Sequence, residues 1–154
     1  MTKKGYNSFM YKIFISPIII ILLLIFIAGM SKGVSDTLQF HYPKSVFNTF
    51  TNHEQYWNPA ISWKNKYKDY DQGDTREAFL FSRSLLVWQT DAWHLVQTIQ
   101  TLAWALALVL ALRLGYKNDT INKHSKLELC YFFIFIYIAF YFGFVFLYDW
   151  ALII

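Results

Sequence analysis

Residues 129–148 read LCYFFIFIYIAFYFGFVFLY, a run of 20 residues without a single charged side chain. A helix that crosses the hydrocarbon of a bilayer needs about 20 mostly apolar residues. The run therefore predicts a membrane-spanning helix near residues 128–148. Two more runs qualify, IFISPIIIILLLIFIAGM at 13–30 and LVQTIQTLAWALALVLALRL at 95–114. We expect an all-α membrane protein, one domain over residues 1–154, with spans near 13–30, 84–114 and 128–148.

The composition of the whole chain agrees with a membrane protein. The residues are 56% hydrophobic and 21% aromatic, and only 16% are charged, whereas soluble domains contain about 25% charged residues. The net charge of +4 is modest, so nucleic acid is not expected as a partner. The single cysteine, Cys130, cannot form an internal disulfide or build a thiolate zinc site.

The distribution of Lys and Arg predicts the orientation of the chain. Residues 1–12 and 113–128 together carry seven of these cations in 28 residues, whereas residues 31–83 carry seven in 53. Cytoplasmic loops are enriched in Lys and Arg. We expect a bacterial inner (cytoplasmic) membrane protein with a cytoplasmic N-terminus and a cytoplasmic loop at 115–127. A cleaved signal peptide is the rival interpretation of the first run, which is long for that role.

The segment between the first two spans, residues 31–83, is too long for a plain connection and is rich in Trp and Tyr. These two residue types favour the boundary between bilayer and water. We expect an extracytoplasmic cap that lies on the outer leaflet. Its stretch PKSVFNTF predicts a short helix with Pro43 in the first turn. The aromatic residues can form either an interface belt or a binding surface.

A polar stripe opens the second span, in the sequence QTDAWHLVQTIQT at 89–101. On a helix that turns 100° per residue, six of its polar side chains fall within an arc of about 120°; they are Thr90, Asp91, His94, Gln97, Thr98 and Thr101. A helix from Ser84 to Leu114 would be about 46 Å long, longer than the ~30 Å hydrocarbon. Asp91 and His94 are therefore expected at the outer boundary of the membrane.

The topology predicts partners for this stripe on the same side of the membrane. Asp36 and His41 follow the first span, Asp91 and His94 precede the second, and Asp149 follows the third. All five lie at a similar expected depth in a bundle only a few helices wide. The sequence thus predicts that carboxylates and imidazoles converge beneath the cap.

Three interpretations of this convergence remain open. Asp36, His41, Asp91 and His94 are candidate ligands of a divalent metal such as Zn²⁺, since imidazole and carboxylate suit such ions. Without a metal, Asp91 would orient His94 as the catalytic acid or base. In the third interpretation, the polar side chains only form hydrogen bonds between helices.

A cationic turn in the cap suggests a substrate-binding surface. Trp63, Lys64, Asn65 and Lys66 are candidate substrate-binding residues, because two cations suit an anionic lipid headgroup. The opposing interpretation is simple charge balance, since the six acidic residues of segment 31–83 nearly cancel its cations.

The segments SDTLQFHYPKSVF, WNPAISWKNKY and LLVWQTDAWHL resemble a family of small bacterial integral membrane proteins. The resemblance covers roughly residues 33–95, and the third segment is the most distinctive. It implies membrane residence but no particular activity, cofactor or fold. It directs attention to the corresponding positions, which are Asp36, His41, Trp63, Lys64, Asn65, Lys66, Asp91, Trp93 and His94.

These observations lead to two expectations about function. The first is an Asp/His site at the extracytoplasmic surface that acts on a lipid or another amphiphile, with or without a metal. The second is a non-catalytic membrane subunit or homo-oligomer, in which the aromatic stretch AFYFGFVF around Gly143 would pack against a partner. Whether the protein is an enzyme stays open at this stage.

Overall fold

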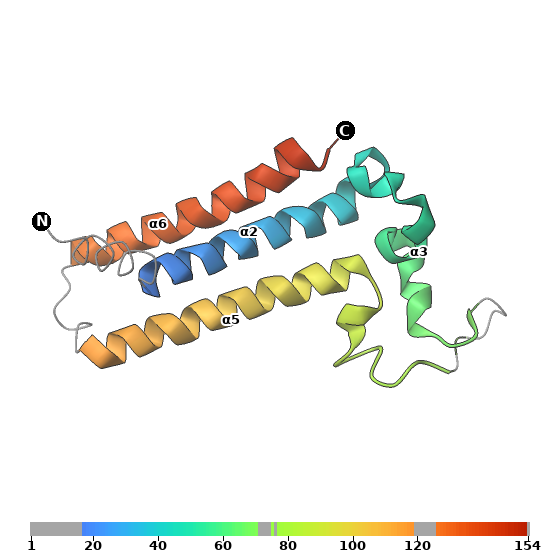
Figure 1. Ribbon diagram of the computed structural model, residues 1–154, viewed down its shortest axis with the longest axis horizontal. Helices are drawn as coiled ribbons and strands as arrows, with labels where there is room; N and C mark the ends of the chain where they lie inside the picture. The colour runs from blue at the N-terminus through green and yellow to red at the C-terminus, as the bar shows by residue number, and fades with distance from the viewer. Residues whose placement is uncertain (1–16, 71–74, 76, 119–125, 154) are drawn as a thin grey trace, which may run out of the picture.

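The computed structural model describes residues 17–70, 75, 77–118 and 126–153, and three long helices dominate it (Figure 1). They are α2 (Pro17–His41), α5 (Ala92–Asn118) and α6 (Lys126–Val145), and α6 continues into a π-helical turn at Phe146–Ala151. All three are long and apolar enough to cross a membrane. The described ranges contain no β-strand. The prediction of an all-α protein with three membrane-spanning helices is confirmed.

Helix α2 is the central helix of the bundle, because it packs against both α5 and α6 (Figure 1). Its Ile21 and Ile25 are almost fully buried and contact Ala107 of α5, together with apolar side chains of α6 such as Ile136. The outer faces of α5 and α6 carry exposed side chains such as Leu106 and Phe133. Exposed apolar faces on spanning helices are the surface that lipid covers.

Glycines allow α2 and α6 to approach each other closely. A Cβ atom added at Gly29 would collide with the carbonyl oxygen of Phe140, and one added at Gly143 would collide with that of Phe26. Small residues at such crossings bring the two backbones into direct contact. Gly143 therefore packs inside the chain, against α2. The contact of the surrounding aromatic stretch with a partner stays a prediction.

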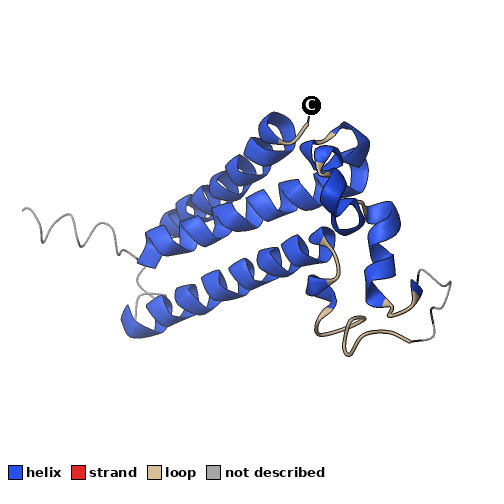
Figure 2. Cartoon of the chain, turned by 45° about the vertical axis from the view of Figure 1, so that its right-hand side comes forward, coloured by secondary structure: helices blue, strands red, loops and turns tan. Residues whose placement is uncertain are grey.

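The cap is a chain of short helical turns that lies at one end of the bundle (Figure 2). It contains α3 (Glu54–Trp57), α4 (Pro59–Ser62) and 3₁₀ turns at Tyr42–Lys44, Val46–Thr49, Thr51–His53 and Trp63–Lys66. The short helix expected at PKSVFNTF is two 3₁₀ turns, with Pro43 in the first turn of the first one. Asn58 starts α4, because its side chain accepts the N–H of Ala60 at 3.0 Å.

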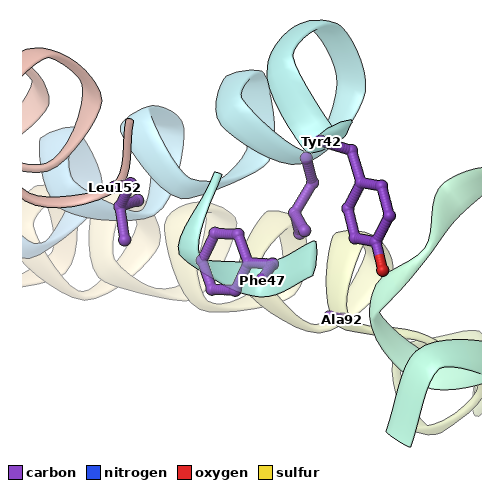
Figure 3. Close-up of a cluster of buried hydrophobic side chains, with 5 residues drawn as sticks. Tyr42, Phe47, Ala92 and Leu152 are labelled. Carbon is purple, nitrogen blue, oxygen red and sulfur yellow. The ribbon is translucent and has the colours of Figure 1, made fainter. Parts of the chain in front are cut away.

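A small hydrophobic core fastens the cap to all three helices (Figure 3). Leu38 of α2, Ala92 of α5 and Leu152 after α6 meet Tyr42 and Phe47 of the cap. The backbone N–H of Val46 also donates to the carbonyl of Leu152 at 2.9 Å. The cap is thus a packed part of the fold, which positions the residues at the start of α5.

Two helix bounds differ from the expected ones. Helix α5 begins at Ala92 and not near Ser84, because the chain forms a 3₁₀ turn at Val87–Gln89 and Asp91 then caps the helix. Helix α2 continues past Met30 to His41, where buried small residues keep it packed against its neighbours. The expected start of the first span, at residues 13–16, lies outside the described ranges.

Candidate functional site

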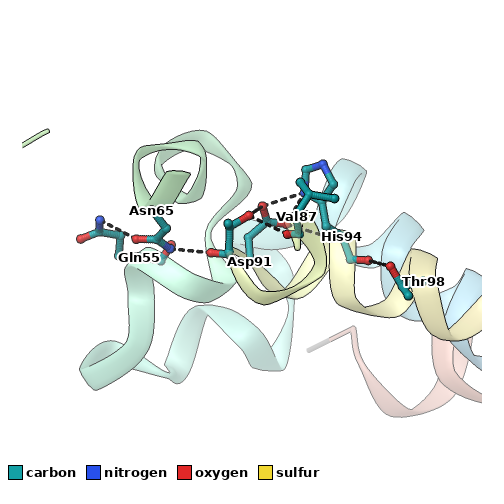
Figure 4. Close-up of polar contacts among 7 residues, drawn as sticks. Gln55, Asn65, Val87, Asp91, His94 and Thr98 are labelled. Atoms are coloured by element: carbon teal, nitrogen blue, oxygen red, sulfur yellow. Dashed lines mark hydrogen bonds and ion pairs between the residues drawn. The ribbon is translucent and has the colours of Figure 1, made fainter. Parts of the chain in front are cut away.

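Asp91 is a buried carboxylate at the N-terminus of α5, with 2% of its surface exposed (Figure 4). Its Oδ1 accepts the backbone N–H of His94 at 2.8 Å, the contact that defines an N-cap. The negative charge also lies at the positive end of the helix macrodipole, which stabilises it. This first role of Asp91 is therefore to start the second spanning helix.

The same carboxylate contacts the imidazole of His94. The Nδ1 atom lies 2.8 Å from Oδ1 and 2.7 Å from Oδ2 of Asp91. A carboxylate that accepts Nδ1–H fixes the imidazole in one tautomer and leaves Nε2 as the acceptor. The predicted pairing of these two residues is present, and it follows from their spacing of three on one helical face.

His94 combines an anchored nitrogen with an accessible one. Its side chain is 27% exposed, whereas that of Asp91 is 3% exposed. Within the described ranges, Nε2 has no hydrogen-bond partner. The indole of Trp93 packs edge-on against the imidazole, with ring centroids 4.9 Å apart. This arrangement suits a histidine that accepts a proton or a hydrogen bond from a bound molecule.

The cap closes over the pair through Asn65. Its Nδ2 donates to the carbonyl of Thr90 at 2.7 Å, and its Oδ1 accepts from Gln55 at 2.7 Å (Figure 4). The hydroxyl of Thr90 in turn lies 3.1 Å from Oδ2 of Asp91. Asn65, a candidate substrate-binding residue, holds the Trp63–Lys66 turn against the start of α5.

Tyr56 is close enough to Asp91 to feel its charge, and it was not among the predicted site residues. Burial raises the pKa of its phenol above 10.0, and the negative charge of Asp91 raises this pKa further. The neutral phenol is therefore the favoured form beside this carboxylate. No spacing rule links residues 56 and 91, because only the folded cap brings them together.

Asp36 and His41 have partners other than Asp91 and His94. Asp36 forms an ion pair with Lys32, one turn earlier on α2. The Nε2 of His41 lies 2.6 Å from the hydroxyl of Tyr148, and the two rings meet edge to face. Tyr148 is the neighbour of Asp149, the residue after the third span that we expected to lie near the site.

The expected metal ligands are thus divided among three separate contacts. In the part of the chain that the structure describes, no three His, Cys, Asp or Glu side chains come close enough to hold a metal ion together. A Zn²⁺ site needs three or four protein ligands around one ion. The prediction of a divalent metal at Asp36, His41, Asp91 and His94 gains no support from this geometry.

The other expected substrate-binding residues have local contacts in the cap. The indole N–H of Trp63 donates to the carbonyl of Ala60 at 3.1 Å. The ammonium of Lys64 lies 4.8 Å from the centre of the Tyr70 ring, within the range of a cation–π interaction. The carbonyl of Lys66 accepts the N–H of Phe79 at 3.0 Å. Lys64 and Lys66 are both partly exposed.

Two threonine hydroxyls of the polar stripe form hydrogen bonds within α5. The hydroxyls of Thr98 and Thr101 each donate at 2.9 Å to a carbonyl one turn earlier, those of His94 and Gln97. Thr101 is exposed on the outer face of the helix. These two hydroxyls therefore bond within α5 and not to another helix.

A cavity of about 360 Å³ lies between the cap and the segment that precedes α5. Apolar side chains line one part of it and polar side chains another; the lining residues are Tyr56, Asn65, Phe79, Leu80, Ser82, Leu86, Gln89 and Thr90. Thr90 and Tyr56 connect this cavity to Asp91. A mixed lining of this kind suits an amphiphilic molecule.

Comparisons with known proteins do not identify relatives of this chain: no family model, curated protein or solved structure matches it.

Proposed function

We propose that this multi-pass protein binds a lipid or another amphiphile at the extracytoplasmic surface of the bacterial inner membrane, with His94 as the residue that contacts the polar head. The observation that carries the proposal is the Asp91–His94 pair. The buried carboxylate fixes Nδ1 at 2.7–2.8 Å, and the partly exposed ring leaves Nε2 to a ligand. Histidines held in this way accept protons from hydroxyl groups.

The surroundings of the pair support an amphiphile as the ligand class. The cavity that adjoins Thr90 has apolar lining from Phe79, Leu80 and Leu86. Asn65 fastens the turn that carries Lys64 and Lys66 to the same point of α5. Cations at a membrane surface attract anionic headgroups. We therefore propose that the amphiphile has an anionic headgroup and that its apolar part lies toward the lipid.

The first experiment measures the protonation pattern of His94. The protein, labelled with ¹⁵N-histidine, is placed in phosphatidylcholine nanodiscs, and His94→Gln assigns the ring signals by NMR. Neutral His94 is expected as the Nδ1–H tautomer, and Asp91→Asn is expected to remove this preference. His53, an exposed histidine of the cap, provides a matched control through His53→Gln.

The second experiment tests the ligand. Replacing phosphatidylcholine with phosphatidylglycerol in the nanodiscs is expected to shift the Nε2 signal of His94 and leave that of His53 unchanged. The double substitution Lys64→Gln/Lys66→Gln is expected to reduce the shift. Equal responses of His94 and His53 to phosphatidylglycerol would contradict the proposal.

The alternative is a non-catalytic membrane subunit, and one observation favours it. Asp91 has a complete structural role as the N-cap of α5, whether or not His94 meets a ligand. In that case phosphatidylglycerol would leave the Nε2 signal of His94 unchanged, and His94→Gln would alter assembly. Native mass spectrometry of the detergent-solubilised protein and its His94→Gln variant distinguishes the two by oligomer mass.

A divalent metal is not part of the main proposal, because its four expected ligands lie in separate contacts. Elemental analysis of the purified protein tests this directly. One equivalent of zinc per chain would restore the metal-dependent alternative, provided that a chelator removes the zinc and lowers the thermal stability.

A further inference from the structure

The segment Phe79–Leu86, with the sequence FLFSRSLL, exposes large apolar side chains and buries one of its serines. Phe79, Leu80, Phe81 and Leu85 are 52%, 76%, 53% and 73% exposed, whereas Ser82 is only 3% exposed. We call this segment the apolar loop. Large apolar side chains gathered on a surface mark a contact with a membrane or another protein.

The apolar loop is held in place by specific contacts of its polar groups. The hydroxyl of Ser82 donates to the carbonyl of Lys66 at 2.9 Å, and the N–H groups of Ser84 and Leu86 both donate to the carbonyl of Phe81 at 3.0 Å. The guanidinium of Arg83 lies 5.0 Å from the centre of the Tyr67 ring. The contact with Lys66 thus joins the loop to the cap, and the bonds to Phe81 fix the turn of the loop itself, with the apolar side chains exposed.

The backbone at Phe81 strengthens this argument. Its φ of 57° lies in the left-handed region, which a bulky residue other than glycine rarely adopts. A residue held there shows that the surrounding contacts determine the conformation. The outward position of Phe81 is therefore part of the fold.

The position of the apolar loop in the fold indicates which kind of partner it contacts. In Figures 1 and 2 the short turn at Val87–Gln89 lies beside the start of α5, on the side away from α2, and the apolar loop leads into this turn. The outer face of α5 carries exposed leucines, including Leu102 and Leu106. The loop thus lies at the end of the bundle where this membrane-spanning helix begins.

We propose that the apolar loop inserts its four large side chains into the outer leaflet, next to the point where α5 enters the membrane. Lipid is the partner, because the loop lies at the end of the bundle where the membrane-spanning helix α5 begins. Insertion would remove Phe79, Leu80, Phe81 and Leu85 from water. It would also place the mouth of the adjoining cavity at the lipid surface. This inference goes beyond the proposed role of His94 and does not depend on it.

Spin labels measure the depth of the loop directly. In a Cys130→Ser background, single cysteines are introduced as Leu80→Cys and Leu85→Cys and labelled with a nitroxide. Thr51→Cys, on an exposed 3₁₀ turn of the cap, is the reference for water. Leu106→Cys, on the outer face of α5, is the reference for lipid. The labelled proteins are studied in phosphatidylcholine–phosphatidylglycerol nanodiscs.

The measured quantity is the ratio of collision with oxygen to collision with a polar nickel complex, obtained by electron paramagnetic resonance. Labels at both loop positions are expected to give ratios close to that of Leu106→Cys and clearly above that of Thr51→Cys. A ratio like that of Thr51→Cys at either loop position would overturn the proposal. Circular dichroism confirms that each variant retains its helices.

Discussion

At the residue scale, Asp91 combines two functions in one carboxylate. One oxygen starts α5 by accepting a backbone N–H, and both oxygens hold the ring of His94. Because the pair lies three residues apart on one helix, its geometry is a local consequence of the sequence. Its burial depends on the cap, through the contacts of Asn65 and Thr90.

The two functions of Asp91 can be separated by substitution. Asp91→Ala removes the cap and is expected to lower the free energy of unfolding by about 1 kcal/mol, the usual cost of a lost N-cap. Asp91→Asn keeps a capping oxygen and is expected to lower it less. Thermal unfolding in detergent micelles, followed by circular dichroism, measures both. Equal losses in the two variants would contradict the assignment of Asp91 as a cap.

Tyr56 reports the charge of Asp91 through its pKa. Burial and the carboxylate together raise this pKa above 10.0, so Asp91→Asn is expected to lower it while burial keeps it above that value. Labelling with ¹³Cζ-tyrosine and assignment by Tyr56→Phe allow an NMR titration of the phenol. An unchanged pKa in Asp91→Asn would show that the two groups do not interact.

The raised pKa of Tyr56 also predicts how stability depends on pH. Well below pH 10.0 the phenol is protonated in the folded and unfolded chains alike, so Tyr56 adds no pH dependence there. Above that pH the unfolded chain releases the proton first, and stability falls as the pH rises. The fall is expected to be smaller in Tyr56→Phe, which thermal unfolding between pH 9 and about 11 measures.

At the element scale, the three apolar runs were sufficient to predict three helices. Their length and lack of charge leave few other structures in a bilayer. The start of α5 was predicted too early, because hydrophobicity alone does not reveal that Asp91 caps the helix after a 3₁₀ turn. The contact between His41 and Tyr148 was also missed, since residues 107 positions apart meet only once α2 and α6 are in register.

The glycine contacts between α2 and α6 give a prediction for this packing. Gly143→Leu would place a side chain against the backbone of α2 at Phe26 and Met30, and overpacking of this kind costs about 1–3 kcal/mol. A lower unfolding temperature is therefore expected. Ala105→Leu, at an exposed position of α5, adds comparable volume toward lipid and is expected to have little effect. Equal effects of both substitutions would contradict the direct contact of the two helices.

At the scale of the whole molecule, the cap and the bundle form one unit. The cluster around Leu38, Phe47 and Leu152 joins the end of α2, the cap and the segment after α6. The Asp91–His94 pair and the apolar loop are both held at the same end of the bundle. The proposed functions of both therefore require this end to face one side of the membrane, and the Lys and Arg distribution predicts the outer side.

Fusions at the two ends of the bundle test this orientation. Alkaline phosphatase, which is active only outside the cytoplasm, is expected to be active when fused after residue 154 and inactive when fused within residues 119–125. Green fluorescent protein at the same sites is expected to give the opposite pattern, because it does not fluoresce when exported in unfolded form. The reverse pattern would place the cap in the cytoplasm, where His94 could not meet a lipid of the outer leaflet. It would contradict the proposed surface of action and leave the three-helix fold intact.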